Sequence, residues 1–190
     1  MDMLYRNVIS FLGLAWVAYW WLSASKVKAT SREESAASRA AHLVPMVVAM
    51  VLLMPIPLPL GFLGERMFTG GPVTHWIGAA VVAAGLAFTV WARVHLGRNW
   101  SGTVTVKNDH ELVRSGPYRF VRHPIYSGAL LAIAGTSLAR GDWRGPLAVL
   151  ILFVALWRKL QHEERWMAEA FGEDYAKYRS EVCALIPFVL

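Results

Sequence analysis

Five stretches of the sequence contain no Asp, Glu, Lys or Arg, and apolar residues fill most of their positions. A helix needs about 20 such residues to cross about 30 Å of hydrocarbon. The fifth stretch is the shortest, and it can cross only if Arg158 and Lys159, which follow it, extend their charged ends to the lipid headgroups. The pattern therefore predicts an all-α membrane protein with about five transmembrane helices, at residues 7–25, 40–64, 67–92, 123–139 and 145–157.

Prolines interrupt the second stretch near its end. Pro45 lies inside the stretch, and Pro55, Pro57 and Pro59 alternate with other residues after Met54. Because proline lacks an N–H group and clashes with the preceding turn, all four prolines cannot occupy one regular helix. We expect a helix that ends near Met54 and an extended segment after it. A re-entrant or surface-lying segment is the alternative.

The composition agrees with a single membrane domain over residues 1–190. Hydrophobic residues make up 56% of the chain and charged residues 17%, whereas soluble domains have about 45–50% and about 25%. The lone Cys183 excludes a disulfide framework and a cysteine-based zinc site, since each needs at least two thiols. The 15 glycines contain no Gly-x-Gly pair, which excludes a Rossmann fingerprint. No two of the six histidines are closer than 13 residues, so we predict no metal site.

The net charge of +6 would suggest nucleic-acid binding in a soluble protein, but here the placement of the charges matters more. Arg6, Arg66, Arg140 and Arg144 fall on one side of the predicted bundle. Most of the other basic residues fall in the first connection, the third connection and the tail. The positive-inside rule then places the N-terminus outside and the tail in the cytoplasm. We predict a multi-pass integral membrane protein with no nucleic-acid partner, in the plasma (inner) membrane rather than an internal one.

Polar residues gather on the predicted cytoplasmic side. The third connection, residues 98–122, is longer than connections in compact domains usually are, which favours a functional role. It leads to His123 and Pro124, and because proline biases its predecessor out of the helical region, we expect His123 at a helix cap. The helix start, flanked by Arg119 and Arg122, suits a carboxylate or phosphate. A capped transmembrane helix with lipid-facing arginines explains the same residues.

A second polar segment, residues 158–165, continues the fifth apolar stretch without a helix breaker. We therefore expect one helix that leaves the membrane. Lys159 and Glu163 are four residues apart and share one face of it. Taken alone, this segment also fits a solvated, salt-bridged helix that anchors the span.

Short motifs follow one another in a fixed order across the second half of the chain. They are His110-Glu111-Leu112-Val113, Gly116-x-Tyr118, Arg122-His123-Pro124-x-Tyr126-x-Gly128, Glu163-Glu164 and Phe171-Gly172-Glu173-Asp174-Tyr175-x-x-Tyr178. This ordered set closely resembles the isoprenylcysteine carboxyl methyltransferase family. The resemblance begins near Leu96, and it separates the N-terminal helices (residues 1–95) from a cofactor-binding half (residues 96–190).

The resemblance implies an integral membrane enzyme that takes a methyl group from S-adenosyl-L-methionine without a Rossmann domain. The family has a substrate-handling arginine four residues before the glutamate, where this sequence has Lys159 with Arg158 beside it. Glu163, Lys159 and Arg158 are therefore the candidate catalytic residues. Lysine keeps the charge but loses the two-pronged grip on a carboxylate. The implied cofactor-binding residues are His110, Glu111, Leu112, Val113, Tyr118, His123, Pro124, Ile125, Tyr126 and Glu163.

The acceptor implied by the resemblance is lipophilic and reaches the site from the membrane lipid. The carboxylate of an isoprenylcysteine-like or prenylated substrate is ionised at neutral pH and needs no base, so Lys159 or Arg158 would only hold it in line. Another small lipophilic thiol or a phospholipid amine would have to lose a proton, to His162 or Glu163. A noncatalytic membrane carrier or scaffold is an alternative of a different class. The sequence does not indicate an oligomeric state.

Overall fold

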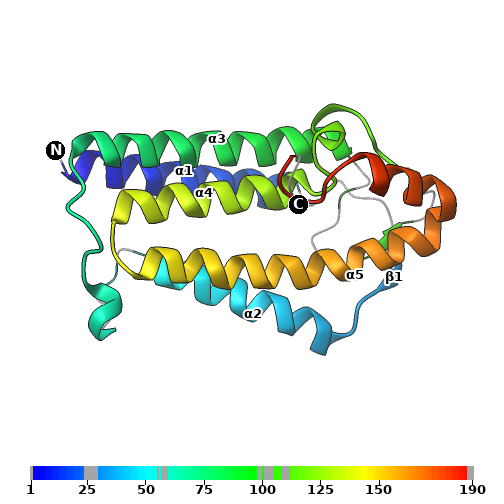
Figure 1. Ribbon diagram of the computed structural model, residues 1–190, viewed down its shortest axis with the longest axis horizontal. Helices are drawn as coiled ribbons and strands as arrows, with labels where there is room; N and C mark the ends of the chain where they lie inside the picture. Colours follow the sequence, from blue (N-terminus) through cyan, green and yellow to red (C-terminus); the bar gives the residue numbers. More distant parts are fainter. Residues whose placement is uncertain are drawn as a thin grey trace.

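The computed structural model is an elongated bundle of helices (Figure 1). It describes residues 2–23, 30–54, 56, 60–97, 100, 105–107 and 112–187. Two single 3-10 turns, η1 (Gly61–Gly64) and η3 (Gly116–Arg119), and two short strands, β1 (Thr30–Glu33) and β2 (Thr105–Lys107), connect the helices. The five α-helices are α1 (Asp2–Ser23), α2 (Ala36–Leu53), α3 (Pro72–Leu96), α4 (Pro124–Arg140) and α5 (Arg144–Glu181).

The helices fall on the five predicted apolar stretches, so the helical architecture is confirmed. α2 contains Pro45 and ends at Leu53 with an extended Met54 as its C-cap, as the prolines predicted. α5 runs through residues 158–165 without a break, which confirms a single helix from the apolar stretch into the polar tail. It turns sharply only at Gly172, whose φ of 52° lies in the region that favours glycine.

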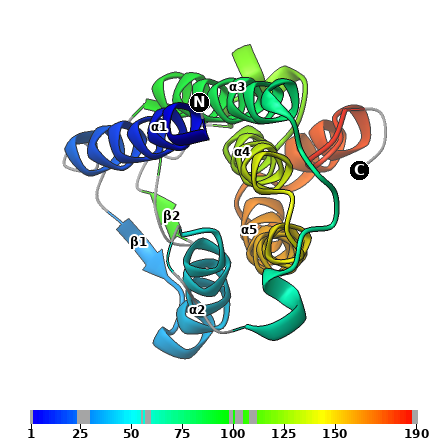
Figure 2. The same cartoon turned by 90° about the vertical axis from the view of Figure 1, so that its left-hand side faces the viewer.

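One element departs from the all-α expectation. β1 and β2 pair as an antiparallel ribbon, with Thr30 opposite Lys107 and Glu33 opposite Thr105. The ribbon joins the first connection to the third, so the N-terminal half of the chain is tied to the segment that carries the predicted cofactor motifs. In Figure 2 it lies beside the helices, between α1 and α2.

The helices pack in the order α1, α3, α4, α5, α2 (Figure 2). The closest pair is α3 and α4, which run antiparallel and meet along a seam of small residues. A methyl group placed on Gly85 would lie 2.6 Å from the Gly128 carbonyl oxygen, and one placed on Gly78 would lie 2.7 Å from the Gly135 carbonyl oxygen. Real Cβ atoms do not approach that closely, so these glycines are required for the two backbones to touch.

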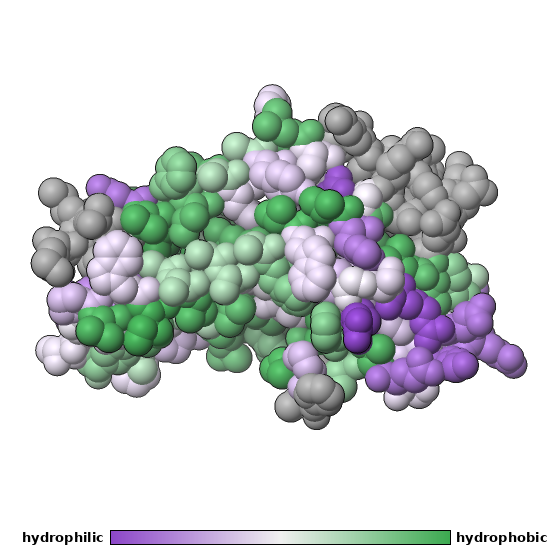
Figure 3. Space-filling model, turned by 90° about the horizontal axis from the view of Figure 1, so that it is seen from above, coloured by the Kyte–Doolittle hydropathy of each residue, from purple (hydrophilic) through white to green (hydrophobic). Residues whose placement is uncertain are grey.

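Apolar side chains cover much of the outside of the bundle, and polar side chains concentrate toward the end where α5 turns (Figure 3). Exposed large apolar residues occur on each of the five helices, for example Phe11, Val44, Val73, Leu131 and Leu150. Among the described residues, α2 and α3 are long and apolar enough to cross a bilayer, and residues 7–23 form a shorter apolar helix. A total of five crossings therefore remains a prediction.

A buried ion cluster closes the end of the bundle where α4 connects to α5. The carboxylate of Asp142, which is 6% exposed, accepts hydrogen bonds from Arg140 Nη2 at 2.7 Å and from Arg144 Nη2 at 2.8 Å. Arg140 Nη1 also donates to the carbonyl oxygen of Leu53 at 3.2 Å. The cluster thus supplies a hydrogen-bond donor to a free carbonyl group at the C-terminal end of α2 and fixes that end to the α4–α5 turn.

Candidate active site

The start of α4 forms one wall of the site. His123 is the N-cap of the helix, with φ −123° and ψ 62°, and Pro124 begins the helix, as predicted. The backbone N–H groups of Arg122 and His123 donate to the carbonyl oxygens of Cys183 and Ala184, at 2.9 and 3.0 Å. Two N–H groups at this helix start are therefore bound by the C-terminal segment and are not left for an anion.

Glu163 on α5 lies against the first turn of α4. Its Oε1 accepts a hydrogen bond from the Tyr126 hydroxyl at 2.6 Å, and its Oε2 is 3.5 Å from His123 Nδ1. Lys159 Nζ is 3.8 Å from the same Oε1 and 5.4 Å from the centre of the Tyr126 ring. The rings of His123 and Tyr126 stack almost in parallel, with centroids 5.3 Å apart. The predicted pairing of Lys159 with Glu163 is confirmed, and it is part of a larger cluster.

The neighbouring Glu164 holds the cluster together. One of its oxygens is 2.7 Å from Arg122 Nε and 3.2 Å from His123 Nε2, and the other is 3.4 Å from Arg179 Nε. The side chain is only 7% exposed. The two adjacent glutamates therefore bind both ring nitrogens of His123, one from each side.

Burial and ion pairing compete in setting the charges of this cluster. Burial acts to raise the pKa of Glu164, but His123 and Arg122 outweigh it and lower that pKa to about 2. For Glu163, burial is again outweighed, by His123 and Lys159, and its pKa lies below the usual value. Both glutamates are thus carboxylates at neutral pH.

Tyr118, in the turn η3, forms a second wall. Its ring stacks on His95 of α3 with centroids 6.5 Å apart, and His95 Nε2 lies 2.8 Å from Ser115 Oγ. Gly116 has a φ of 59°, and a Cβ there would lie 2.6 Å from the His95 ring. Tyr178 donates a hydrogen bond to the Tyr118 carbonyl oxygen at 2.5 Å. η3 is therefore fixed between α3 and the last turns of α5.

Arg93 of α3 joins two helix ends beside this wall. Its side chain donates to the carbonyl oxygen of Ser23, the last residue of α1, at 2.7 Å and to that of Gly97 at 2.8 Å. The guanidinium also lies 4.4 Å from the centre of the Trp100 ring. Arg93 is 4% exposed, so a buried cation donates hydrogen bonds to carbonyl groups at the C-terminal ends of α1 and α3.

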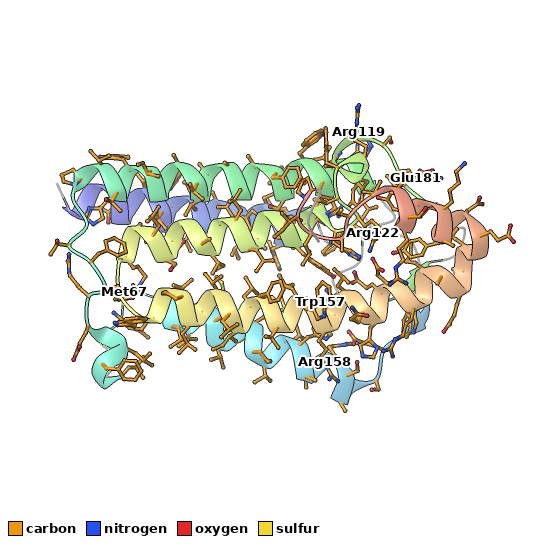
Figure 4. All side chains as sticks on the ribbon, viewed as in Figure 1. Met67, Arg119, Arg122, Trp157, Arg158 and Glu181 are labelled. Carbon is orange, nitrogen blue, oxygen red and sulfur yellow. The ribbon has the colours of Figure 1, made fainter. Side chains whose placement is uncertain are left out.

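The contacts above bring most of the predicted site residues together at one end of the bundle, the end where Arg119 and Arg122 lie (Figure 4). Leu112 and Val113 lie half-buried in the segment before η3. Arg158 is exposed and lies outside the cluster of Lys159 and Glu163, whereas His110 and Glu111 are outside the described residues. The predicted residues that do gather are Tyr118, His123, Pro124, Ile125, Tyr126, Lys159 and Glu163.

Four further residues of the site were not among the predicted catalytic or cofactor-binding residues, although two of them, Arg122 and Glu164, belong to the quoted motifs. Glu164 and Arg122 stand next to predicted residues in their motifs, and this adjacency was the available signal. Arg179 and His95 carried no local signal, because their contacts to Glu164 and Ser115 are made only by the fold.

Comparisons with known proteins identify the family of the chain. The sequence model described as phospholipid methyltransferase matches residues 73–174, which contain α3, η3, α4 and most of α5. Protein-S-isoprenylcysteine O-methyltransferase B of Arabidopsis thaliana is 27% identical over 151 residues, which cover 74% of each chain. The Schizosaccharomyces pombe protein-S-isoprenylcysteine O-methyltransferase is 33% identical over 104 residues, which cover 52% of this chain and 43% of the relative.

A solved structure has the same fold. It is the eukaryotic intramembrane Ras methyltransferase, an isoprenylcysteine carboxyl methyltransferase, with a TM-score of 0.57 and 23% sequence identity over 84% of this chain and 55% of that chain. The family match spans more than half of the sequence, so the chain belongs to the phospholipid methyltransferase family. Within that family its curated relatives are isoprenylcysteine methyltransferases, which confirms the resemblance drawn from the motifs. The chain is an integral membrane protein, and it spans about half the length of several of these relatives.

Proposed function

We propose that this protein transfers a methyl group from S-adenosyl-L-methionine to the carboxylate of an isoprenylcysteine-like acceptor in the membrane. The observation that carries the proposal is the cluster of Glu163, Tyr126, His123 and Lys159. These residues come from two different helices, and all of them lie within residues 73–174, which the family model matches.

The residues of the cluster fit the proposed cofactor. S-adenosyl-L-methionine supplies an electrophilic methyl group on a positively charged sulfur. The side chain of Glu163 is 23% exposed and ionised at neutral pH, so its negative charge faces solvent on one side. The aromatic face of Tyr126 offers a second site of attraction for a cation. We propose that these two residues hold the cofactor together with His110, Glu111, Leu112, Val113, Tyr118, His123, Pro124 and Ile125.

Lys159 has the position and the burial expected of a residue that holds a carboxylate acceptor. It is 6% exposed, and its ammonium group lies beside the Tyr126 ring and Glu163. An acceptor carboxylate is ionised at neutral pH, so the residues need only orient it and exclude water. Arg158, exposed on the next position of α5, would act at most at the rim of the site.

We further propose that the site faces the cytoplasm, with the N-terminus outside. The ribbon, η3 and the polar end of α5 lie at the same end of the bundle (Figure 1), and these segments contain Arg32, Lys107, Arg119 and Arg179. This end is where a water-soluble cofactor could enter. The plasma (inner) membrane is the proposed location.

A phospholipid amine, or another small lipophilic thiol, is the second candidate acceptor. The description of the matched family model favours keeping it. Such an acceptor must lose a proton, and His162 and Glu163 are the candidate bases. Comparing acceptors distinguishes the two hypotheses. If the carboxylate is the acceptor, converting it to a carboxamide abolishes methylation, whereas methylation of an amine does not depend on that carboxylate.

The first experiment is calorimetric titration of the detergent-purified protein with S-adenosylhomocysteine, beside the His123→Ala variant. Micromolar binding that weakens strongly in the variant supports the cofactor site. A methyl-transfer assay then compares farnesylcysteine with its carboxamide, in wild-type protein and in Glu163→Ala. We expect transfer to the free acid alone and no turnover in Glu163→Ala. Absence of binding by folded wild-type protein would refute the proposed function and favour a noncatalytic carrier or scaffold.

A further inference from the structure

The chain returns to the start of α4 after α5 ends (Figure 1). We call residues 182–185 the C-terminal strap. The backbone N–H groups of Arg122 and His123 donate to the carbonyl oxygens of two consecutive strap residues, at 2.9 and 3.0 Å. The carbonyl oxygen of the next strap residue, Leu185, accepts a hydrogen bond from the Ser127 hydroxyl at 2.5 Å. Three consecutive carbonyl groups of the strap are therefore bonded to one helix start.

The strap takes the place of a capping side chain on α4. The first N–H groups of a helix have no partner inside the helix, and the side chain of the N-cap residue commonly accepts from them. In the described part of the chain, the N-cap residue His123 makes no side-chain capping bond. Its ring nitrogens lie 3.5 Å from Glu163 and 3.2 Å from Glu164 instead. Because the strap binds the backbone of this helix start, the His123 ring is available to the two glutamates.

The apolar side chains of the strap pack behind the candidate active site. Ala184 is 5% exposed and Leu185 is 2% exposed, and they form one buried cluster with Leu160 of α5. Tyr126 packs against this cluster, and its hydroxyl donates to Glu163 at 2.6 Å. The strap thus supports the α4 side of the site through packing as well as through hydrogen bonds.

Ser127 joins the strap to the first turn of α4 through its side chain. The hydroxyl that donates to Leu185 also lies 3.2 Å from the carbonyl oxygen of His123, so the strap and the N-cap meet at one group. We propose that Ser127 is a positioning residue of the cofactor site: it ties the strap to α4 and thereby holds His123 and Tyr126 in place against α5. This inference rests on the proposed function. It assigns a role to a position that the motif of residues 122–128 leaves open.

The test is calorimetric titration of wild type, Ser127→Ala and Ser127→Thr with S-adenosylhomocysteine, well below the melting temperature of each protein. We expect Ser127→Ala to weaken binding about fivefold, the effect of one lost hydrogen bond. Ser127→Thr keeps a hydroxyl donor and should bind within about twofold of wild type. With farnesylcysteine as acceptor, Ser127→Ala should raise the cofactor KM and leave the acceptor KM nearly unchanged. The reason is that Lys159, the residue proposed to hold the acceptor, belongs to α5.

Thr136→Val is the matched control. The Thr136 hydroxyl donates to the carbonyl oxygen of Ala132 at 3.0 Å, farther along the same helix, so its loss should leave the cofactor affinity unchanged. Leu185→Ala perturbs the strap from its own side chain. Because Ser127 and Leu185 act through the same strap, the double variant should weaken binding by less than the product of the two single effects.

Three results would overturn the inference. They are a Ser127→Ala variant that binds as tightly as Thr136→Val, even if its melting temperature falls, a Ser127→Thr variant that recovers no affinity, and single effects that simply multiply in the double variant. Failure of the proposed function is recognised separately, by wild-type protein that neither binds S-adenosylhomocysteine nor methylates the acceptor.

Discussion

Replacing Glu164 by glutamine should lower the stability of the protein substantially. The substitution keeps the shape of the side chain but removes the charge that meets Arg122, His123 and Arg179. The pKa of Glu164 is about 2, compared with a usual value of 4.5. This difference corresponds to about 3 kcal/mol of folding free energy at neutral pH. For a chain of this size, that loss should lower the melting temperature by about 10 °C.

The pH dependence of the loss tests its electrostatic origin. Because the pKa of Glu164 is lower in the folded state, its contribution is fully present above pH 4.5 and disappears as the pH falls from 4.5 toward 2. Thermal unfolding of the detergent-solubilised protein, followed by circular dichroism, should therefore show a gap between wild type and Glu164→Gln that narrows across this range. Glu173→Gln is the control, since Glu173 is exposed on the same helix. Equal melting temperatures at pH 7, or a gap that persists undiminished near pH 2, would refute the reasoning.

Three more predictions concern the bundle. Gly85→Leu should destabilise the protein by about 3 kcal/mol, the cost of severe overpacking, because a Cβ there would lie 2.6 Å from the backbone of α4. Gly13→Leu should leave the stability unchanged, because nothing lies within 4 Å of a Cβ at that position. Unfolding of the detergent-solubilised variants compares the two. Asp142→Asn should cost about 3 kcal/mol, because it removes the charge of a buried carboxylate that two half-buried arginines share. The same unfolding measurement checks this, and a change under about 1 kcal/mol would contradict it. Arg93→Ala should cost about 3 kcal/mol of folding free energy, because it removes two charge-assisted hydrogen bonds. It should also weaken S-adenosylhomocysteine binding in calorimetry. An unchanged affinity would show that Arg93 does not contribute to the site.

Much of the fold could be predicted because its signals are local. Apolar stretches and prolines identify the helices and the end of α2 at Leu53, since hydropathy and the missing N–H group act on the segment itself. The ribbon could not be predicted in the same way. Its first strand, Thr30–Glu33, has no apolar alternation, and its partner lies more than 70 residues away. The pairing is therefore a contact that only the tertiary fold creates.

The site divides in the same manner. The motif order marks His123, Tyr126 and Glu163, because their spacing is written in the sequence. The spacing does not indicate which of the two adjacent glutamates, Glu163 or Glu164, is the more buried. Neighbouring residues on a helix point about 100° apart, so the rotation of α5 about its axis decides this. The 7% exposure of Glu164 and the 23% exposure of Glu163 record that rotation.

The seam between α3 and α4 has a consequence for how the bundle can move. Gly78 and Gly85 are seven residues apart, as are Gly128 and Gly135, so small residues face one another again only after a slide of one full repeat, about 10 Å. Any smaller slide would press methyl groups into backbone atoms. α3 and α4 should therefore behave as one rigid spine. Any opening that admits a lipid tail would have to come from the outer helices, α1 or α2, swinging away from it.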